Sequence, residues 1–239
     1  MLSYEEKAAY ELKHWQRKVS RKPSLADRLT KGWQTKVNNI IPDQVHRALT
    51  VAIRNMTEAV LIGSQFISGE PLKGLVSLEE REKLVRDKLI FYKKAAAAEG
   101  AGTGVGGIFL GLADFPLLLS LKMKFLFDTA GLYGYDTKNL RERLFILHIF
   151  QLAFSSAARR REVYFQILNW EERSRELPAG LDSLDWRLFQ QEYRDYIDLA
   201  KMLQMVPGIG AVVGAYANYQ LLDKLGQTAV NCYRLRLLK

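Results

Sequence analysis

The sequence has 239 residues, 48% of them hydrophobic and 26% charged, and its formal net charge is +9. This balance is typical of a folded globular protein, and it excludes a disordered chain and a protein made of many membrane spans. The charge favours acidic partners, such as anionic lipid headgroups, nucleic acid or an acidic protein surface. The single cysteine, Cys232, excludes an intramolecular disulfide and a zinc site built from cysteines, and it fits a cytoplasmic protein.

The first 67 residues predict helices separated by breaks. Ser3 and Glu6 have the spacing of a capping box, Pro23 breaks the chain, and Pro42 suits the first turn of a third helix that Gly63 interrupts. The charged N-terminus shows no apolar stretch of a secretory signal. Three apolar stripes recur at helical spacing: Ala8, Leu12, Trp15 and Val19; Leu25, Leu29, Trp33 and Val37; and Val45, Leu49, Ile53 and Met56.

A glycine-rich run marks the middle of the chain. After a loop at residues 68–74, Ser77 and Glu80 form another capping box and open a helix that we expect to end near residue 98. Six of the twelve residues at 100–111 are glycine, and several are four apart, which lets another backbone approach one helix face closely. We expect Asp114 to cap the next helix, with Pro116 in its first turn and an end near residues 131–134.

The C-terminal part predicts more helices. An apolar helix follows residue 137, residues 159–176 are amphipathic, residues 177–180 form a loop, and a helix opens at residues 183–185. After a break at residues 206–208, a last helix repeats the glycine pattern with Gly210 and Gly214. No strand pattern is found. The sequence thus predicts one all-α domain over residues 1–239, a multi-helix bundle with N-terminal helices at 1–67, a glycine-motif helical core at 77–239, and two glycine-rich apolar helices as its central elements.

Residues 101–121 have the length of a membrane span, but Asp114 and Pro116 interrupt them. The second glycine-rich segment is interrupted by Asn218 and Asp223. We therefore favour a soluble or peripheral protein over one with a transmembrane or re-entrant hairpin.

Motifs for catalysis or cofactor binding are missing. Residues 102–107 match G-x-G-x-x-G, but a helix-forming segment rich in alanine and lysine precedes them instead of a strand. The three histidines fall on different predicted helices, so we expect no metal, no cofactor and no catalytic set. Asp114 is read as a helix cap, with a polar handle for a ligand or a switch as the alternative. Nucleic-acid binding is not favoured, because the aromatic residues lie on apolar stripes.

Basic residues cluster beside the apolar segments. This arrangement suits an anionic membrane surface, at roughly 1 kcal/mol for each cation near it. The alternative is a set of solvated helix faces. Lys122 and Lys124 follow the glycine run, and Arg234 and Arg236 lie near the end of the chain. The residues predicted to face a membrane are Lys13, Arg17, Lys18, Lys93, Lys94, Arg159, Arg160 and Arg161.

Residues 98–136 read AEGAGTGVGGIFLGLADFPLLLSLKMKFLFDTAGLYGYD, and residues 206–236 read VPGIGAVVGAYANYQLLDKLGQTAVNCYRLR. These segments and the opening SYEEKAAYELKHWQRK resemble the EcsC family over essentially the whole chain. The family takes its name from an operon of Gram-positive bacteria that also encodes an ABC transporter linked to protein secretion. The resemblance carries over no catalytic residue. It suggests a candidate functional core of Glu99, Gly100, Gly104, Gly107, Gly111, Asp114, Pro116, Tyr133, Tyr135, Gly208, Gly210, Gly214 and Asn218.

Together, the resemblance and the residues predict a non-enzymatic accessory protein at the inner face of the cell membrane. It would bind an anionic membrane surface, a lipid or an apolar ligand, and the resemblance implies ABC transporter subunits as further partners. Two alternatives stay open. One is a hydrolase-type enzyme that acts on a lipid or hydrophobic substrate with Glu99 and Asp114 as acid and base. The other is a soluble scaffold for transporter subunits.

Overall fold

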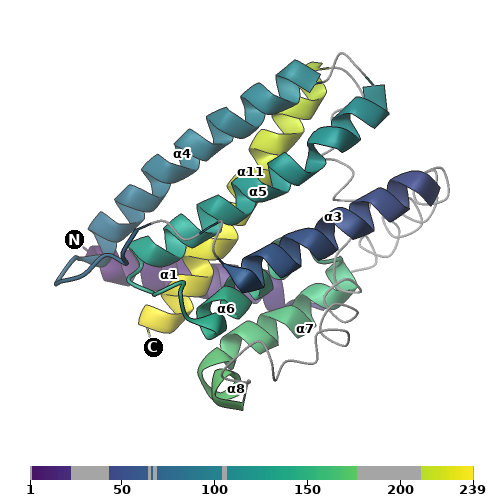
Figure 1. Cartoon of the computed structure of the whole chain (residues 1–239). Coiled ribbons are helices and arrows are strands. Elements are labelled where there is room, and N and C mark those ends of the chain that lie inside the picture. The colour runs from purple at the N-terminus through teal and green to yellow at the C-terminus, as the bar shows by residue number, and fades with distance from the viewer. Residues whose placement is uncertain are drawn as a thin grey trace.

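In the computed structural model, which describes residues 2–22, 43–63, 66, 69–103, 107–176 and 211–238, the regular elements are α-helices (Figure 1). The predicted all-α class is therefore confirmed. The helices expected at residues 25–37 and from residue 183 lie outside the described residues. The described helices are α1 (Tyr4–Ser20), α3 (Asp43–Ile62), α4 (Leu78–Thr103), α5 (Gly107–Leu132), α6 (Leu140–Phe154), α7 (Ala157–Leu168), α8 (Trp170–Glu176) and α11 (Ala211–Leu237).

Local capping signals predict the starts of α1 and α4 correctly. The backbone amide of Glu6 donates to Ser3 Oγ at 3.2 Å, and the Ser3 amide donates to the Glu6 carboxylate at 2.7 Å. Ser77 and Glu80 repeat this exchange at the start of α4, with distances of 3.2 and 3.0 Å. Each pair satisfies backbone donors that a helix start leaves free, so the signal is contained within four residues.

Two boundaries around the glycine run differ from the prediction. Helix α4 continues to Thr103, beyond the expected end near residue 98, and α5 begins at Gly107, before Asp114. Asp114 and Pro116 therefore lie inside α5, and the interpretation of Asp114 as the helix cap is wrong. Pro116 removes one backbone hydrogen bond from the helix. Burial of Phe115 and Leu118 on either side of it favours the helical path.

Glycines with positive φ close two helices where the sequence predicts ends. Gly63 follows α3 with a φ of +80°, and Gly134 follows α5 with a φ of +91°. An L-amino acid with a side chain is strained in this region, whereas glycine is not. The apolar stripe of α3, Val45, Leu49, Ile53 and Met56, is buried as predicted.

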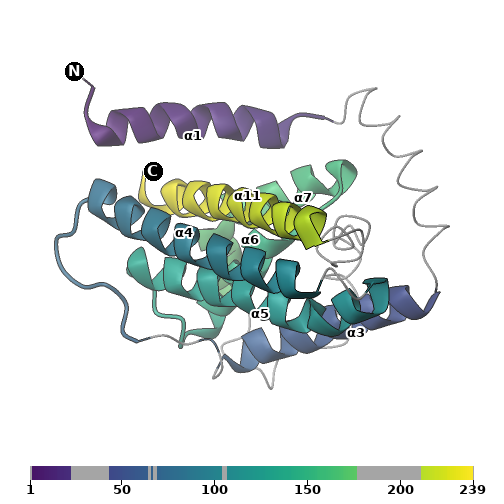
Figure 2. The same ribbon diagram turned by 90° about the horizontal axis from the view of Figure 1, so that it is seen from above.

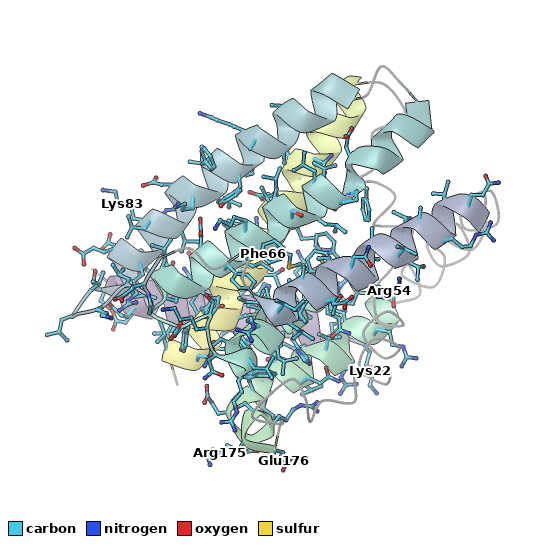
Figure 3. The ribbon with its side chains drawn as sticks, viewed as in Figure 1. Lys22, Arg54, Phe66, Lys83, Arg175 and Glu176 are labelled. Carbon is cyan, nitrogen blue, oxygen red and sulfur yellow. The ribbon has the colours of Figure 1, made fainter. Side chains whose placement is uncertain are left out.

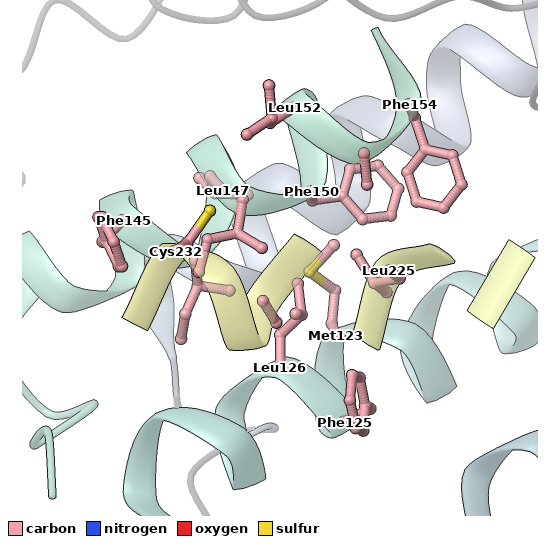
Figure 4. Close-up of a cluster of buried hydrophobic side chains, with 14 of the residues drawn as sticks. Met123, Phe125, Leu126, Phe145, Leu147, Phe150, Leu152, Phe154, Leu225 and Cys232 are labelled. Carbon is pink, nitrogen blue, oxygen red and sulfur yellow. The ribbon is translucent and has the colours of Figure 1, made fainter. Parts of the chain in front are cut away.

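Helix α11 lies at the centre of the fold. It packs against α4, α5, α6 and α1. Figures 1 and 2 show it running along α4, and Figure 2 shows α1 above it. Figure 4 shows Leu225 and Cys232 of α11 between Leu126 of α5 and Leu147 of α6. These four side chains are buried, and burial raises the pKa of the Cys232 thiol. The apolar core is therefore organised around the helix that comes last among those described.

The glycine-rich parts of the chain approach one end of the molecule. The C-terminal end of α4, the N-terminal end of α5 and the N-terminal end of α11 lie together there in both ribbon views (Figures 1 and 2). The central role predicted for the glycines themselves stays a prediction, because much of both segments lies outside the described side chains. Within the described ranges, no helix is both long enough and apolar enough to cross a membrane.

Candidate functional site

A buried lysine of α5 is the most unusual charged group of the described structure. The Lys122 side chain is 0% exposed, and its ammonium donates to the Leu118 carbonyl at 3.4 Å and to Asn218 Oδ1 at 3.3 Å. An ammonium has three protons to donate, and hydrogen bonds between charged partners are usually shorter than 3 Å. The charge of Lys122 is thus held by two long contacts to neutral oxygens.

Burial lowers the pKa of Lys122 from 10.5 to about 7. Desolvation penalises the charged form, and no charged group in the described part of the chain contributes to the shift. The amine and the ammonium are therefore both populated near neutral pH. Such a perturbed group is a candidate functional residue, because most lysines stay fully protonated under the same conditions.

Asn218 of α11, which belongs to the predicted candidate core, forms the other half of this site. It is 0% exposed, so the Lys122–Asn218 hydrogen bond joins α5 to α11 inside the molecule. The sequence prediction missed Lys122 by treating it as one of the basic residues that flank the glycine run. The signal was present in its register, because Lys122 lies four residues after Leu118 and four before Leu126, on the buried stripe of α5.

Lys93 joins α4 to α11 beside this site. Its ammonium lies 2.6 Å from Asp223 Oδ1 and 3.9 Å from the centre of the Tyr219 ring. The side chain is largely buried, so Lys93 differs from the exposed, membrane-facing lysine that the sequence predicts. Burial lowers its pKa, but the interactions with Asp223 and Tyr219 together more than offset this, and the net shift is upward. Lys93 is therefore a paired cation, in contrast to Lys122.

Tyr133 and Tyr135 of the predicted core lie at the opposite end of α5, against the ring of Tyr233 in α11. The ring centres of Tyr133 and Tyr135 lie 4.8 and 5.4 Å from that of Tyr233. Arg236 stacks on Tyr135 at 3.7 Å and donates to both oxygens of Glu142, at 2.7 and 2.9 Å. Burial raises the pKa values of Tyr133 and Tyr233, so both hydroxyls stay protonated. This cluster fixes the end of α11.

A second arginine of α11 crosses three helices. Arg234 donates to both oxygens of Glu82, each at 2.7 Å, and to Glu11 at 2.8 Å. The Tyr4 hydroxyl also donates to Glu82, at 2.6 Å. These bonds tie α1 and α4 to α11, which gives Arg234 a structural role that its place in a basic C-terminal cluster did not suggest.

A small cavity of about 200 Å³ opens between α4, α5 and the loop before α4. Its buried carboxylate, Asp128, accepts from the Tyr92 hydroxyl at 3.0 Å and pairs with Lys88 at 3.2 Å. Both contacts use the same oxygen of Asp128, and Lys88 supplies the counter-charge. The lining residues are Glu70, Leu72, Lys88, Asp128, Gly131 and Leu132.

The remaining members of the candidate core do not meet in one described site. Asp114 is half-buried and Pro116 exposed, both in α5. Within the described ranges, no group of three His, Cys, Asp or Glu side chains is placed to hold a metal ion. Glu99 and Gly100 belong to the helix backbone of α4, Gly107 and Gly111 to α5, and Gly214 to α11, while Gly104, Gly208 and Gly210 lie outside the described residues.

Two basic clusters far apart in the sequence lie on neighbouring helices. Helix α1 packs against α7, where Gln16 donates to the Tyr164 hydroxyl at 3.1 Å and Trp15 meets the Tyr164 ring edge-on at 6.0 Å. Figure 3 shows Lys22 on the side of the molecule where α7 lies. We call Lys13, Arg17, Lys18, Arg159, Arg160 and Arg161 the basic face.

The members of the basic face are accessible to different degrees. Lys13, Arg17 and Lys18 are exposed on α1, and Arg159 is exposed on α7, where it pairs with Glu162 at 2.9 Å. Arg160 and Arg161 are half-buried. Lys94, also predicted to face a membrane, is exposed on α4, apart from this face.

Comparison with known proteins shows which family the chain matches. The model of the EcsC protein family matches residues 6–238. The chain is similar to Protein EcsC of Bacillus subtilis (strain 168), with 48% identity over 225 residues, 94% of this chain and 92% of that protein. It is also 31% identical over 229 residues to the uncharacterized protein YdbA of the same strain, covering 92% of this chain and 84% of that protein. No solved structure matches.

Proposed function

Because the chain belongs to the EcsC protein family, we propose that it is a non-enzymatic accessory protein that attaches to the inner face of the cell membrane through its basic face and assists an ABC transporter there. The observation that carries the attachment is the packing of α1 against α7, which joins two separate basic clusters on neighbouring helices. The link to a transporter comes from the family resemblance alone.

Electrostatics supplies the binding energy of this attachment. A cation near an anionic bilayer contributes roughly 1 kcal/mol, and the contributions of neighbouring cations accumulate. Within the described part of the chain, the exposed α1 residues Lys13, Arg17 and Lys18 form no ion pair. Arg159 of α7, in contrast, forms an ion pair with Glu162. We therefore expect α1 to provide most of the attraction. Salt screens such contacts strongly, so the attachment is expected to be reversible.

Vesicle flotation tests this proposal. The purified protein is mixed with neutral vesicles or with vesicles that contain anionic lipid, at low and at high salt. We expect flotation only with anionic lipid and only at low salt. The triple variant Lys13→Gln, Arg17→Gln and Lys18→Gln should float poorly, because it removes three exposed charges from the basic face.

A second triple variant provides the matched control. Arg47→Gln, Arg54→Gln and Lys83→Gln removes the same charge from exposed positions of α3 and α4, and Lys83 lies on the other side of the molecule in Figure 3. This variant should float like the unmodified protein. Equal loss in both variants would show that net charge alone drives binding and would contradict a dedicated face. Absence of flotation for the unmodified protein would exclude the membrane proposal and favour a soluble scaffold.

A further inference from the structure

We propose that Lys122, positioned by Asn218, binds the anionic head of a single-chain amphiphile whose alkyl chain lies between α5 and α11. The proposal rests on the proposed function, because a protein that works at a lipid surface has such molecules at hand. It names the site and the chemical class of the ligand, which are a carboxylate or phosphate head on an apolar chain. The argument rests on the charge balance, the apolar surroundings and the access route of this site.

The charge balance at Lys122 is incomplete in the described structure. Lys93, Arg234 and Arg236 show what completion looks like, because they pair with Asp223, Glu82 and Glu142. Arg143, which is buried to 9% exposure, donates to the carbonyls of Thr137 and Lys138 instead, but only Lys122 is 0% exposed among these cations. Lys122 instead meets one backbone carbonyl and one side-chain amide. A buried charge without a counter-charge is costly, and an anionic ligand would remove that cost.

The surroundings of this cation suit an alkyl chain. Helices α5 and α11 face each other with apolar side chains, and Figure 4 shows Met123 and Leu126 of α5 opposite Leu225 of α11. All three are buried, as are Leu118 of α5 and Leu222 of α11. A free inorganic anion would gain nothing from these walls. A ligand with an apolar tail would bury that tail as it neutralises the lysine.

The N-terminal parts of α5 and α11, which precede this site in the chain, are suited to opening. Pro116 removes a backbone hydrogen bond from α5 less than two turns before Lys122. Glycine in a helix costs roughly 1 kcal/mol relative to alanine, which makes local opening cheaper. The ends of α4, α5 and α11 lie at the same end of the molecule (Figure 1), so the chain of the ligand would enter there. The glycines within these three helix ends are Gly100, Gly102, Gly107, Gly111 and Gly214.

Proton uptake distinguishes this site from an ordinary surface lysine. The pKa of Lys122 is about 7 without a counter-charge, so the side chain is mostly neutral at pH 8. A bound anion favours the charged form and raises this pKa, and binding at pH 8 must then take up a proton. An exposed lysine is already protonated at that pH and takes up none.

Titration calorimetry at pH 8 tests the proposal, with dodecanoate and dodecyl phosphate as monomeric probes and inorganic phosphate as the probe without a chain. Repeating the titration in two buffers of different ionisation enthalpy measures proton uptake. We expect both amphiphiles to bind with proton uptake and inorganic phosphate not to bind. Lys122→Met should weaken binding about ten- to hundredfold and abolish proton uptake, because it removes a charge-assisted contact and keeps the volume. The control Lys94→Met, which removes an exposed lysine of α4, should bind like the unmodified protein.

A second variant keeps the proposal falsifiable if Lys122→Met folds poorly. Asn218→Leu retains the lysine and removes the oxygen that holds its ammonium in place, and it should weaken binding while proton uptake persists. The proposal is overturned if the unmodified protein binds neither amphiphile, if Lys122→Met binds as tightly as the unmodified protein, or if inorganic phosphate binds equally well. The triple α1 variant should still bind dodecanoate, because no vesicle takes part. Failure of this inference is thereby separable from failure of membrane attachment.

Discussion

The guanidinium of Arg234 shows how much the stability of this molecule can depend on a single buried ion pair. Its side chain and that of Glu82 are 8% and 2% exposed, so the pair is removed from water almost completely. Two parallel hydrogen bonds of 2.7 Å compensate for the lost hydration. Removal of Arg234 leaves the Glu82 carboxylate buried with the neutral Tyr4 hydroxyl and without a counter-charge in this pair, which is the costliest way to change it.

We therefore expect Arg234→Met to lower the free energy of unfolding by about 3–5 kcal/mol. The double variant Arg234→Met with Glu82→Leu should recover most of this loss, because it removes both charges. Urea denaturation of the three proteins measures the coupling. Arg159→Met, which breaks the exposed pair with Glu162, is the control and should cost less than about 1 kcal/mol. Additive effects of the two buried substitutions would contradict this account.

The pKa of Lys122 predicts a pH dependence of stability. The folded value of about 7 lies below the ordinary 10.5 expected for the unfolded chain. Between these values the unfolded chain binds more protons, so a rise in pH stabilises the folded state. From pH 7 to 9 this gain is about 2 kcal/mol, and Lys122→Met should lack it. Chemical unfolding at both pH values checks this, and parallel profiles for the two proteins would refute it.

At the scale of elements, the contact between α4 and α11 includes one tightly enclosed glycine. A Cβ atom at Gly226 would lie 2.7 Å from Cδ2 and 2.9 Å from Cδ1 of Leu89. A side chain at this position therefore requires the end of the Leu89 side chain to move away. The sequence pattern of glycines four apart did not include Gly226, so this close contact was missed.

Gly226→Val is expected to lower the free energy of unfolding by about 1–3 kcal/mol through overpacking. Adding Leu89→Ala should restore part of the loss by making room for the new side chain. Gly131→Ala is the matched control, because a Cβ at this helical glycine meets nothing within 4 Å. That substitution should be neutral or slightly stabilising. If Gly226→Val leaves thermal unfolding unchanged, the α4–α11 contact is more tolerant than its geometry indicates.

Element starts were predictable where the signal is local, and element ends were not where packing decides. The capping boxes at Ser3 and Ser77 are complete within four residues, so both helix starts were found. The capping role of Asp114 was wrong because burial of Phe115 and Leu118 outweighs the local preference of an acid before a proline. For the same reason the spacing of Lys122 indicates its burial, but only the fold reveals that Asn218 is its partner.

At the scale of the whole molecule, α1 is attached to the rest at both of its ends. Its N-terminal part reaches Glu82 through Tyr4, and its C-terminal part packs Trp15 against Tyr164. The sequence predicted α1 and its buried stripe but gave no partner for it, because contacts across the fold leave no local pattern. The same limit explains why the two halves of the basic face were predicted separately.

Deletion of residues 1–22 is therefore expected to lower the Tm and to increase binding of a dye that detects apolar surface, because it uncovers α7 and α11. Differential scanning calorimetry and dye fluorescence measure the two effects. Glu11→Gln is a milder control, since this carboxylate is 64% exposed and Arg234 keeps its bonds to Glu82. An unchanged Tm after the deletion would mean that α1 is an appendage of the fold.

The central position of α11 has a consequence for how the protein folds during synthesis. Helix α11 follows the other described helices in the chain, yet α1, α4, α5 and α6 all pack against it. During synthesis these helices leave the ribosome before α11 has been made. Their apolar faces are therefore exposed to water or bound by chaperones until then. Completion of the core thus has to wait until α11 has left the ribosome. A ribosome stalled before residue 211 should carry a protease-sensitive nascent chain.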